Sequence, residues 1–263
     1  DIFAALNISK SLPKNQGTVI IKHANPCGVA VNSNKIESFK LALKSDPISA
    51  YGGIVSCNFK INKKLANELD KIFFEVIIAD AFDKDSLKIL KKKKNLRIID
   101  SSDLKNNEIL SYNNNFNTLL LQTADNLKFS SKNFKVVSKL KPNSKILKNL
   151  IFAFNICRFV KSNAIVLTKD KSTVGIGSGQ PSRLDSCKIA ISKLKKFNSK
   201  IEGDILAASD AFFPFVDGIE TLVQSGVTAV IQPSGSIRDK EIIKYANDAG
   251  IVLVFSKTRH FRH

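Results

Sequence analysis

Short apolar runs alternate with segments of helical patterning along this chain, and this alternation constrains the fold more than any other feature of the sequence. The apolar runs have the length of strands, and the segments between them carry apolar residues at the spacing of one helix face. Such alternation favours an α/β architecture in which helices cover a sheet. In the first half we expect strands at residues 18–21, 76–79 and 96–99, a Gly-containing strand or turn segment at residues 49–57, and helices at residues 36–44, 62–73 and 86–94.

The second half of the chain shows the same alternation more regularly. A run rich in Ser and Asn, residues 101–117, lacks periodicity and is expected to be a loop. We place the division between residues 137 and 138, which gives two units, 1–137 and 138–263. After the loop we expect strands at residues 118–123, 135–138, 164–168, 173–176, 205–209, 228–231 and 251–255, and helices at residues 145–160, 184–196, 218–225 and 239–249.

Composition narrows the class of protein. No apolar run approaches the length of a membrane span, and the N-terminus lacks a basic region followed by an apolar core. The four cysteines form no CxxC pair, which argues against a disulfide scaffold and against a cysteine zinc site. We therefore expect a cytoplasmic protein without a membrane partner. The chain begins with Asp1 and contains no methionine, so we expect a fragment of a longer protein.

The formal net charge of +18 raises the alternative of a basic nucleic-acid-binding protein. Lysine and asparagine are used freely along the whole chain, and the densest run, residues 91–94, ends an expected helix, where cations complement the helix dipole. The sequence contains no RNP-like aromatic strand, no zinc-finger spacing and no recognisable helix-turn-helix. A basic surface also suits phosphorylated small substrates. We therefore expect no nucleic-acid partner and keep this class as the alternative.

The run at residues 22–28, Lys-His-Ala-Asn-Pro-Cys-Gly, is the strongest functional signal. Asn-Pro and Cys-Gly predict a turn directly after an apolar strand, and open α/β sheets bind ligands beyond the carboxyl ends of their strands. Lys22 can stabilise a developing oxyanion, and His23 can transfer a proton near neutral pH. At such a turn we interpret Lys22-His23 as a functional pair, in preference to a surface lysine beside a structural histidine.

Four further runs carry groups that could bind a ligand. Residues 49–53, Ser-Ala-Tyr-Gly-Gly, contain paired glycines that permit close approach of the backbone. Residues 161–164, Lys-Ser-Asn-Ala, precede a Gly-rich turn at 175–183 that suits anion binding at a helix N-terminus, although its spacing is neither Rossmann nor Walker. Residues 209–217 combine aspartates with phenylalanines, and residues 258–263 form a basic aromatic tail. Each run alone is also compatible with a bulge, a core cluster or a solvated tail.

Together these runs resemble the AICAR transformylase domain of the bifunctional purine biosynthesis enzyme, and they occur in the order of that family's motifs over nearly the whole chain. The resemblance implies a duplicated cytidine-deaminase-like fold with three-layer α/β/α units. It also implies that an IMP cyclohydrolase domain, and a segment with an Arg-Tyr substrate motif, precede this region in the parent protein and are absent from the fragment. The family forms homodimers, so we expect a homodimer.

The resemblance implies transfer of a formyl group from 10-formyltetrahydrofolate to the 5-amino group of AICAR, giving FAICAR. Lys22, His23 and Asn163 correspond to catalytic residues, and His263 matches the family's final histidine. The family needs no catalytic metal, and the resemblance allows a structural monovalent cation. The residues matched to AICAR binding are Tyr51, Gly52, Glu75, Arg183, Phe212, Asp217 and Arg259. The residues matched to folate binding are Leu184, Phe212, Pro214 and Ser236.

The chain departs from the family pattern at Gly218, where some relatives carry a folate-contacting Asn, and also at Asp80 and Pro181. None of these departures removes a proposed catalytic group. Two alternatives remain beside the nucleic-acid-binding class. One is a zinc deaminase on a related fold, for which the HxE and CxxC motifs are absent. The other is a homologous fragment that is inactive without its upstream segment.

Overall fold

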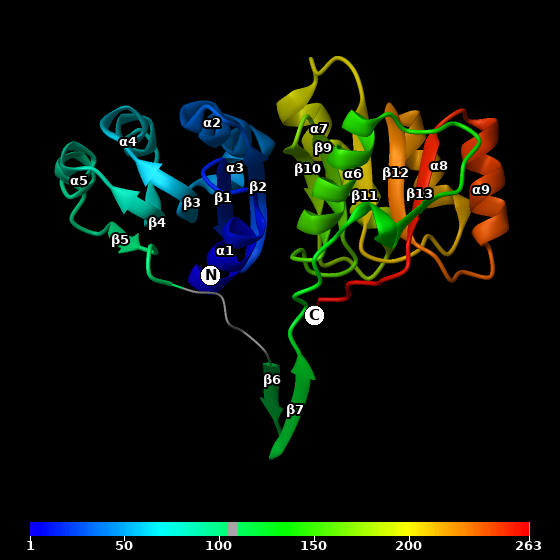
Figure 1. Ribbon diagram of the computed structural model, residues 1–263, viewed down its shortest axis with the longest axis horizontal. Coiled ribbons are helices and arrows are strands. Elements are labelled where there is room, and N and C mark those ends of the chain that lie inside the picture. The colour runs from blue at the N-terminus through cyan, green and yellow to red at the C-terminus, as the bar shows by residue number, and fades with distance from the viewer. Residues whose placement is uncertain (105–109, 263) are drawn as a thin grey trace.

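The computed structural model of the protein describes residues 1–104 and 110–262 and is built around one large sheet (Figure 1). Helices cover both faces of this sheet, which confirms the predicted α/β class with three layers. Among the described residues, the strands of this sheet lie in the spatial order β5 (Arg97–Asp100), β4 (Phe74–Phe82), β3 (Gly53–Ile61), β1 (Gly17–Lys22), β2 (Asn25–Val31), β10 (Ser172–Gly177), β9 (Ile165–Lys169), β11 (Ile205–Ser209), β12 (Val227–Pro233), β13 (Val252–Ser256) and β8 (Phe134–Val136).

The two halves of the sheet repeat one strand order. From the centre outward, the first half runs β2-β1-β3-β4-β5 and the second runs β10-β9-β11-β12-β13. In each half the two innermost strands form an antiparallel hairpin. The third strand pairs antiparallel with its neighbour in that hairpin, β3 with β1 and β11 with β9. The two outer strands of each half run parallel to the third strand. The halves join where β2 pairs with β10, with Ser172 opposite Ala30. The topology is therefore duplicated, although the sequence shows no internal repeat.

The helices are distributed unequally over the two faces. One face carries α1 (Ile2–Ser11) and α6 (Ser144–Cys157), whose apolar residues form a single core that runs across both halves. The opposite face has two separate cores, one for each half. Its helices are α2 (Lys35–Ser45), the short α3 (Pro47–Ala50), α4 (Lys63–Asp70) and α5 (Lys84–Leu90) in the first half, and α7 (Arg183–Asn198), α8 (Val216–Gln224) and α9 (Asp239–Asp248) in the second.

Strand β1 shows why the sequence before the Lys-His pair is apolar at every position. Val19 and Ile21 enter the core shared with α1 and α6, whereas Ile20 faces the core of the opposite face, and all three are fully buried. A strand that is covered on both faces reads as a continuous apolar run. Burying each of these side chains stabilises the fold by roughly 1.5–3 kcal/mol. The strand is therefore a firm anchor for the turn that follows it.

Helix starts follow capping side chains. Asn62 Oδ1 accepts a hydrogen bond of 3.0 Å from Leu65 N, which confirms Asn62 as the predicted cap of α4. The helix predicted at residues 62–73 nevertheless ends at Asp70, because Phe74 already belongs to β4 and is buried there. Within the described parts of the chain, none of the helices combines the length and apolar character needed to span a membrane.

The sequence-based expectation lacks several of the observed elements, among them α1, β2, the short α3 and β6. The run that predicts a turn at residues 22–28 contains a turn only at His23 and Ala24, whose φ angles are +53° and +58°. Pro26 therefore lies inside β2, opposite Ile21 and next to a bulge, where its missing N–H is tolerated. Hairpin pairing with β1 overrides the local turn propensity of Asn-Pro and Cys-Gly.

Gly28 lets β2 approach the helix that covers it. A Cβ at this position would lie 1.8 Å from the Ala42 carbonyl oxygen of α2. The second half repeats this close approach, because a Cβ at Gly175 or Gly177 of β10 would lie 2.2 or 1.9 Å from a carbonyl oxygen of α7. Close packing of strand on helix therefore accounts for Gly175 and Gly177 of the Gly-rich run, whereas Gly179 has a φ of +68° and meets no neighbour.

A separate two-stranded hairpin projects from the body of the molecule (Figure 1). It consists of β6 (Leu110–Asn115) and β7 (Thr118–Thr123), so the strand predicted at 118–123 is confirmed. The loop predicted at 101–117 is wrong for β6, and its residues 105–109 lie outside the described residues. The polar composition of residues 110–115 favours a loop. These residues form a strand only because they pair with the leucine-rich β7, and local composition does not reveal that pairing.

Strand β8 lies before the predicted division between residues 137 and 138 and pairs with the far edge of the second half. Val136 of β8 is opposite Val254 of β13. The strand predicted at 135–138 thus begins one residue earlier and ends two residues earlier than expected. The division into units 1–137 and 138–263 itself stays a prediction.

Candidate active site at one sheet edge

The predicted site residues gather toward one edge of the large sheet. There β1 ends and β2 begins, with Lys22 paired to Asn25. Across the join, β10 ends at the same edge with Gly177 opposite Ile165, the first residue of β9. Ser209, the last residue of β11, is also opposite Ile165. Since β12 and β13 run parallel to β11, their carboxyl ends lie at this edge as well.

In the first half the same edge carries the beginnings of the outer strands. β3 is antiparallel to β1, and β4 is parallel to β3, so Tyr51 and Gly52 precede β3 and Glu75 is the second residue of β4. The predicted position of the Lys22-His23 pair after the carboxyl end of a strand therefore holds for β1. Tyr51, Gly52 and Glu75 reach the same edge at the beginnings of strands, because the equivalent strands of the two halves run in opposite directions there.

Lys22 is held beside the turn that enters β3. Its Nζ donates a hydrogen bond of 2.7 Å to the Tyr51 carbonyl oxygen. Gly52, at a φ of +71°, donates its N–H to the Phe73 carbonyl oxygen at 2.8 Å, which fixes this turn against the start of β4. The ring of Tyr51 lies 5.3 Å from that of Phe73 and remains 62% exposed, and Glu75 is exposed nearby in sequence. The sequence-predicted residues Lys22, Tyr51 and Gly52 are therefore neighbours.

His23 presents its imidazole from a fixed backbone. The N–H groups of His23 and Ala24 donate to the two carboxylate oxygens of Asp1, at 3.1 and 2.7 Å. The His23 side chain is exposed. Its positive φ places it in a region that non-glycine residues other than Asn, Asp and His seldom occupy. The turn thus leaves the His23 side chain exposed on a backbone that Asp1 holds in place.

Cys27, in the same motif, is not available for chemistry. Its side chain is buried in the core beneath α2. Burial, with the nearby negative charge of Asp46 as a smaller cause, raises the pKa of the Cys27 thiol to about 12. The thiol therefore stays neutral at physiological pH and serves packing.

Asn25 connects the Lys-His motif to the second half of the molecule. Its Oδ1 accepts a hydrogen bond of 3.0 Å from Lys161 N. Lys161 directly precedes Ser162 and Asn163 at the start of β9. Two motifs that are more than a hundred residues apart in the sequence are thereby brought into contact.

Asn163 and Arg183 form one hydrogen-bonded unit. Arg183 Nη2 donates to Asn163 Oδ1 at 2.6 Å, and Arg183 Nη1 donates to Ser209 Oγ at 2.8 Å and to the Asp210 carboxylate. Asn163 Nδ2 donates to the carbonyl oxygens of Gln180 and of the following residue, both at 2.9 Å. Arg183 is only 8% exposed, so its guanidinium is committed to this network.

The residues after β11 surround the start of α8. Phe212 is half-buried, and Pro214 and Asp217 are exposed. Asp217 lies in the first turn of α8, where its Oδ1 accepts a hydrogen bond of 2.7 Å from Gly218 N. A Cβ at Gly218 would lie 2.6 Å from the ring of Phe213, so packing of that ring requires glycine here.

The last predicted residues lie around the same edge. Leu184 is half-buried in the first turn of α7, and Ser236 is half-buried after β12, with its Oγ accepting from Arg238 N at 3.1 Å. Arg259 is exposed in the tail that follows β13. His263 lies outside the described residues.

The family follows from comparison with known proteins. The model of the family described as "AICARFT/IMPCHase bienzyme" matches residues 1–193. The chain belongs to this family. It is 43% identical over 264 residues to the bifunctional purine biosynthesis protein PurH of Leptospira biflexa and 41% identical over 269 residues to PurH of Aquifex aeolicus. Both alignments cover all of this chain and 51% of the relative, so the chain spans about half the length of the curated relatives it matches. PurH of Buchnera aphidicola subsp. Acyrthosiphon pisum is 46% identical over 247 residues.

Three residues of the edge site in this AICARFT/IMPCHase chain are missing from the sequence-based assignment. Asp1 holds the His23 turn, Ser162 donates through Oγ to the Asp210 carboxylate, and Asp210 is fully buried beside Arg183. Ser162 and Asp210 lie within the motifs of the family resemblance. Neither corresponds to a matched site residue, so the sequence does not indicate a role for them. Contacts between strands that are distant in sequence assign their roles.

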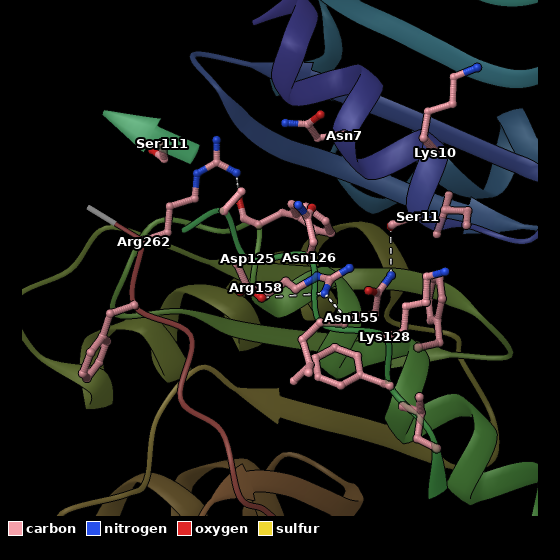
Figure 2. A pocket seen from close by; sticks show the side chains of 18 of the residues that line it. Asn7, Lys10, Ser11, Ser111, Asp125, Asn126, Lys128, Asn155, Arg158 and Arg262 are labelled. Atoms are coloured by element: carbon pink, nitrogen blue, oxygen red, sulfur yellow. Dashed lines mark hydrogen bonds and ion pairs between the residues drawn. The ribbon is translucent and has the colours of Figure 1, made fainter. Parts of the chain in front are cut away.

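A cleft of about 1450 Å3 is lined by residues of α1, α6, the β6–β7 hairpin, the segment after β7 and the C-terminal tail (Figure 2). None of the predicted site residues lines it. Asp125 is the one carboxylate among the described residues that line it, and it accepts a hydrogen bond of 2.6 Å from His260 Nδ1. Although burial favours the neutral acid, His260 and Arg158 lower the pKa of Asp125. The basic residues along the cleft are Lys10, Lys128, Lys148, Arg158, Lys171 and Arg262.

The described residues offer no cluster of three or more His, Cys, Asp or Glu side chains for a metal ion. Asp210 is a buried carboxylate beside the Ser162 hydroxyl, which is the kind of oxygen donor that a monovalent cation takes. Each of its carboxylate oxygens, however, already accepts a hydrogen bond, one from Arg183 and one from Ser162. A carboxylate oxygen that accepts one hydrogen bond keeps a second lone pair, so the structural monovalent cation stays a prediction.

Proposed function

We propose that this domain transfers a formyl group from 10-formyltetrahydrofolate to the 5-amino group of AICAR, giving FAICAR in a late step of purine biosynthesis. The observation that carries the proposal is the contact of the Lys22-His23 hairpin with the Asn163 segment, through the 3.0 Å hydrogen bond between Asn25 and Lys161. Membership of the AICARFT/IMPCHase family and the PurH relatives support the same reaction. For the parent protein we also propose an IMP cyclohydrolase activity, outside this chain.

The reaction makes two demands on the site. The amine of AICAR is a poor nucleophile because its lone pair delocalises into the imidazole and carboxamide. A bond forms between that nitrogen and the formyl carbon, the bond from the formyl carbon to N10 of the folate breaks, and one proton moves from the amine to N10. The site must therefore accept and return a proton, and it must stabilise the tetrahedral oxyanion.

His23 and Lys22 meet these two demands. The exposed imidazole of His23, on a backbone fixed by Asp1, is the proposed proton acceptor. Lys22 uses one ammonium N–H on the Tyr51 carbonyl oxygen, which leaves two donors for the oxyanion. One well-placed oxyanion donor contributes about 3 kcal/mol to transition-state stabilisation.

Asn163 is proposed to act as an acceptor. Both N–H groups of its amide are used on backbone carbonyl oxygens, and Arg183 occupies one lone pair of Oδ1. The second lone pair of Oδ1 remains, and it suits an N–H group of AICAR better than an oxyanion. This refines the catalytic role implied by the family resemblance.

The binding residues divide by exposure. Arg259 and Asp217 are exposed charged groups and are proposed to hold AICAR, with Phe212 packing on its ring and Tyr51, Gly52 and Glu75 at the first-half side. Arg183, although it is buried, is also proposed to belong to the AICAR-binding residues. The folate is proposed to lie against Leu184, Phe212, Pro214 and Ser236. The cytoplasm is the proposed location, in keeping with four free, buried cysteines.

A homodimer is also proposed, and the β6–β7 hairpin supports it. Leu110, Tyr112, Leu119 and Leu121 lie on one face of the hairpin by their pairing and are 48–74% exposed. A lone two-stranded hairpin is marginally stable in water. The run 110–123 carries no charged residue in a chain of net charge +18, so two copies can meet there without like-charge repulsion. Sedimentation of the parent protein with Leu119 and Leu121 changed to Ser is expected to show a shift toward monomer.

The deciding experiment measures formyl transfer by the parent protein, which includes the upstream segment, with His23→Asn. Asparagine tolerates the positive φ of this turn, so the variant removes the imidazole without straining the backbone. We expect kcat to fall by a factor of about 10²–10⁴. The control is Ala24→Gly, which relaxes the same turn and keeps the imidazole.

Three outcomes favour the alternatives. An inactive but folded and dimeric wild type contradicts the enzyme assignment, and salt-sensitive DNA binding unaffected by His23→Asn supports a nucleic-acid role. Activity of the parent without activity of this chain alone identifies an inactive fragment. Stoichiometric zinc in the purified protein supports the deaminase alternative.

A further inference from the structure

Two neighbouring loops of the second half bring an arginine onto an aromatic ring. Phe215 directly precedes α8 in the loop after β11, and Arg238 directly precedes α9 in the loop after β12. Because β11 and β12 are neighbouring parallel strands, both loops leave the sheet at the same edge. The guanidinium carbon of Arg238 lies 4.9 Å from the centre of the Phe215 ring. Open α/β sheets bind ligands beyond the carboxyl ends of such strands, so the pair stands where a ligand is expected.

Large apolar side chains stand open to solvent at this pair. Phe215 is 53% exposed, and Ile237, next to Arg238 in the chain, is 99% exposed. A single exposed apolar side chain is common on protein surfaces and needs no explanation. Here two of them accompany a cation at the edge that carries the proposed site, and ligand sites combine apolar walls with a few placed polar groups. The combination suits a ligand with a flat apolar body and an anionic end.

Arg238 keeps most of its hydrogen-bonding capacity. Its Nη1 donates to Glu241 Oε2 at 3.1 Å, and among the residues that the structure describes the guanidinium makes no other hydrogen bond. A guanidinium has five N–H donors in a planar fork that matches the geometry of a carboxylate. Stacking on Phe215 holds the flat face of this fork, so its edge remains available to an anion.

The loop that carries Arg238 does not depend on the ion pair with Glu241. Asp239 fixes the loop, because its carboxylate accepts from Gly235 N at 2.8 Å and from Ser236 N at 3.3 Å. The side chains of Arg238 and Glu241 are 42% and 55% exposed, and ion pairs between exposed side chains contribute little to stability. An anionic ligand can therefore take the place of Glu241 at little cost.

The proposed co-substrate needs a cation that the folate-binding residues named so far do not supply. A tetrahydrofolate ends in a glutamate with two carboxylates, and a carboxylate that leaves water requires a charged or hydrogen-bonding partner. The residues proposed to lie against the folate carry no positive charge; they are Leu184, Phe212, Pro214 and Ser236. Phe215 directly follows the third of these residues, and Arg238 donates its backbone N–H to Ser236 Oγ at 3.1 Å. The pair thus extends the same wall with a cation.

We propose that Arg238, held on the ring of Phe215, binds the glutamate carboxylates of the folate co-substrate. The inference rests on the proposed function, because it deepens the folate site named there. It makes Arg238 a determinant of co-substrate specificity, remote from the formyl group. Removal of the guanidinium therefore weakens folate binding and leaves the chemical step intact.

The test compares two co-substrates in the full-length parent protein: 10-formyltetrahydrofolate, and 10-formyltetrahydropteroate, which lacks the glutamate. For wild type we expect a KM about 10- to 100-fold lower for the folate than for the pteroate, the scale of hydrogen bonds between charged groups. Arg238→Gln should raise the KM for the folate to that for the pteroate. The KM for the pteroate, the KM for AICAR and kcat should all stay at wild-type values.

Two further variants separate this role from general effects of charge. Lys240→Gln removes an exposed cation two residues after Arg238 and should leave the KM for both co-substrates unchanged. Glu241→Gln removes the carboxylate that competes for Arg238, so it should lower the KM for the folate by about two-fold, the scale of an exposed ion pair. Arg238→Gln and Glu241→Gln break the same ion pair but are expected to shift this KM in opposite directions.

A merely structural role of the Arg238–Glu241 pair predicts similar small changes of the melting temperature in both variants and no change of KM. That result overturns the proposal, as does an equal rise of KM for both co-substrates in Arg238→Gln. If the wild-type parent transfers no formyl group, the proposed function fails. Calorimetric titration of wild type and Arg238→Gln with tetrahydrofolate and tetrahydropteroate then decides the subsite, and equal affinity of wild type for both compounds, or binding of neither, overturns it.

Discussion

The two halves of the sheet share one strand order but hold their functional groups in different ways. In the first half, Lys22 and His23 lie on a hairpin turn, and the His23 side chain is exposed. In the second half, Arg183 and Asp210 form a buried ion pair that fixes Asn163. If the proposed function holds, the same topology supplies accessible reactive groups from one half and a rigid framework from the other. Groups that move protons need access to substrate, whereas groups that orient others gain precision from burial.

The comparison predicts unequal costs for removing one cation from each half. Arg183→Met leaves Asp210 as an unpaired buried charge and is expected to lower the free energy of unfolding by about 3–5 kcal/mol. Lys22→Met removes a cation next to solvent and should change that free energy by less than about 0.5 kcal/mol. Urea unfolding of the parent protein measures both. Equal losses would contradict the division into a reactive and a framework half.

Formyl-transfer activity, unlike stability, should depend strongly on Lys22. Lys22→Met is expected to reduce kcat for formyl transfer by a factor of about 10²–10³, which is roughly 3–4 kcal/mol of transition-state stabilisation. The loss follows from the two ammonium donors left free by the hydrogen bond to Tyr51. Lys35→Met, in the first turn of α2, is the control and should retain activity. A similar loss in both variants would indicate a general effect of charge.

Replacing a glycine where a strand packs closely on a helix should destabilise both halves to a similar extent. Gly28→Ala and Gly177→Ala each place a methyl group within 2 Å of a helix carbonyl oxygen. We expect each change to lower the free energy of unfolding by about 1–3 kcal/mol, because backbone atoms have to shift. Thermal or urea unfolding of each variant checks this. A large cost in one half alone would show that the repeated topology is not matched by repeated packing.

Acid should weaken an ion pair that joins the two halves. Asp46, before α3, bonds Lys193 of α7 at 2.8 Å. Burial opposes ionisation, but the hydrogen bonds from Lys193 and Ser49 outweigh it and lower the pKa of Asp46. A lowered folded-state pKa means that this contribution is fully present above the unfolded-state pKa of about 3.9 and is lost as the pH falls through the folded-state value. Asp46→Asn should therefore cost about 1–2 kcal/mol at pH 7 and less below pH 4. A cost independent of pH would contradict this assignment.

The smallest effect is expected at the cysteines. Burial raises the pKa of Cys27 in the first half and of Cys187 in the second half to about 12. Both thiols should therefore resist alkylation by iodoacetamide at pH 8 in the native protein and react only after unfolding. Mass spectrometry measures the extent of labelling. Rapid labelling of Cys27 alone would show that the Lys-His turn is more open than the fold indicates.

Local patterns predicted most of this protein, because the information for those elements is local. Apolar runs identified β1 and β11, and Asn62 identified a helix start through a cap that depends on residues three positions apart. The motif around Lys22 and His23 indicated both the family and the site. The run 110–115 failed because its strand character depends on pairing with β7, and β2 failed because its turn-forming residues are overridden by pairing with β1.

The sequence by itself determined the alternating α/β architecture, the identity of the functional motifs and the membership of the family. Tertiary structure alone decided that the outer strands of the two halves meet one edge from opposite directions, that Asn25 connects the two motifs, and that Arg183 is buried against Asp210. The physical reason is range: periodicity and capping act within a few residues. Strand direction, burial and charge pairing are set only when segments more than a hundred residues apart come into contact.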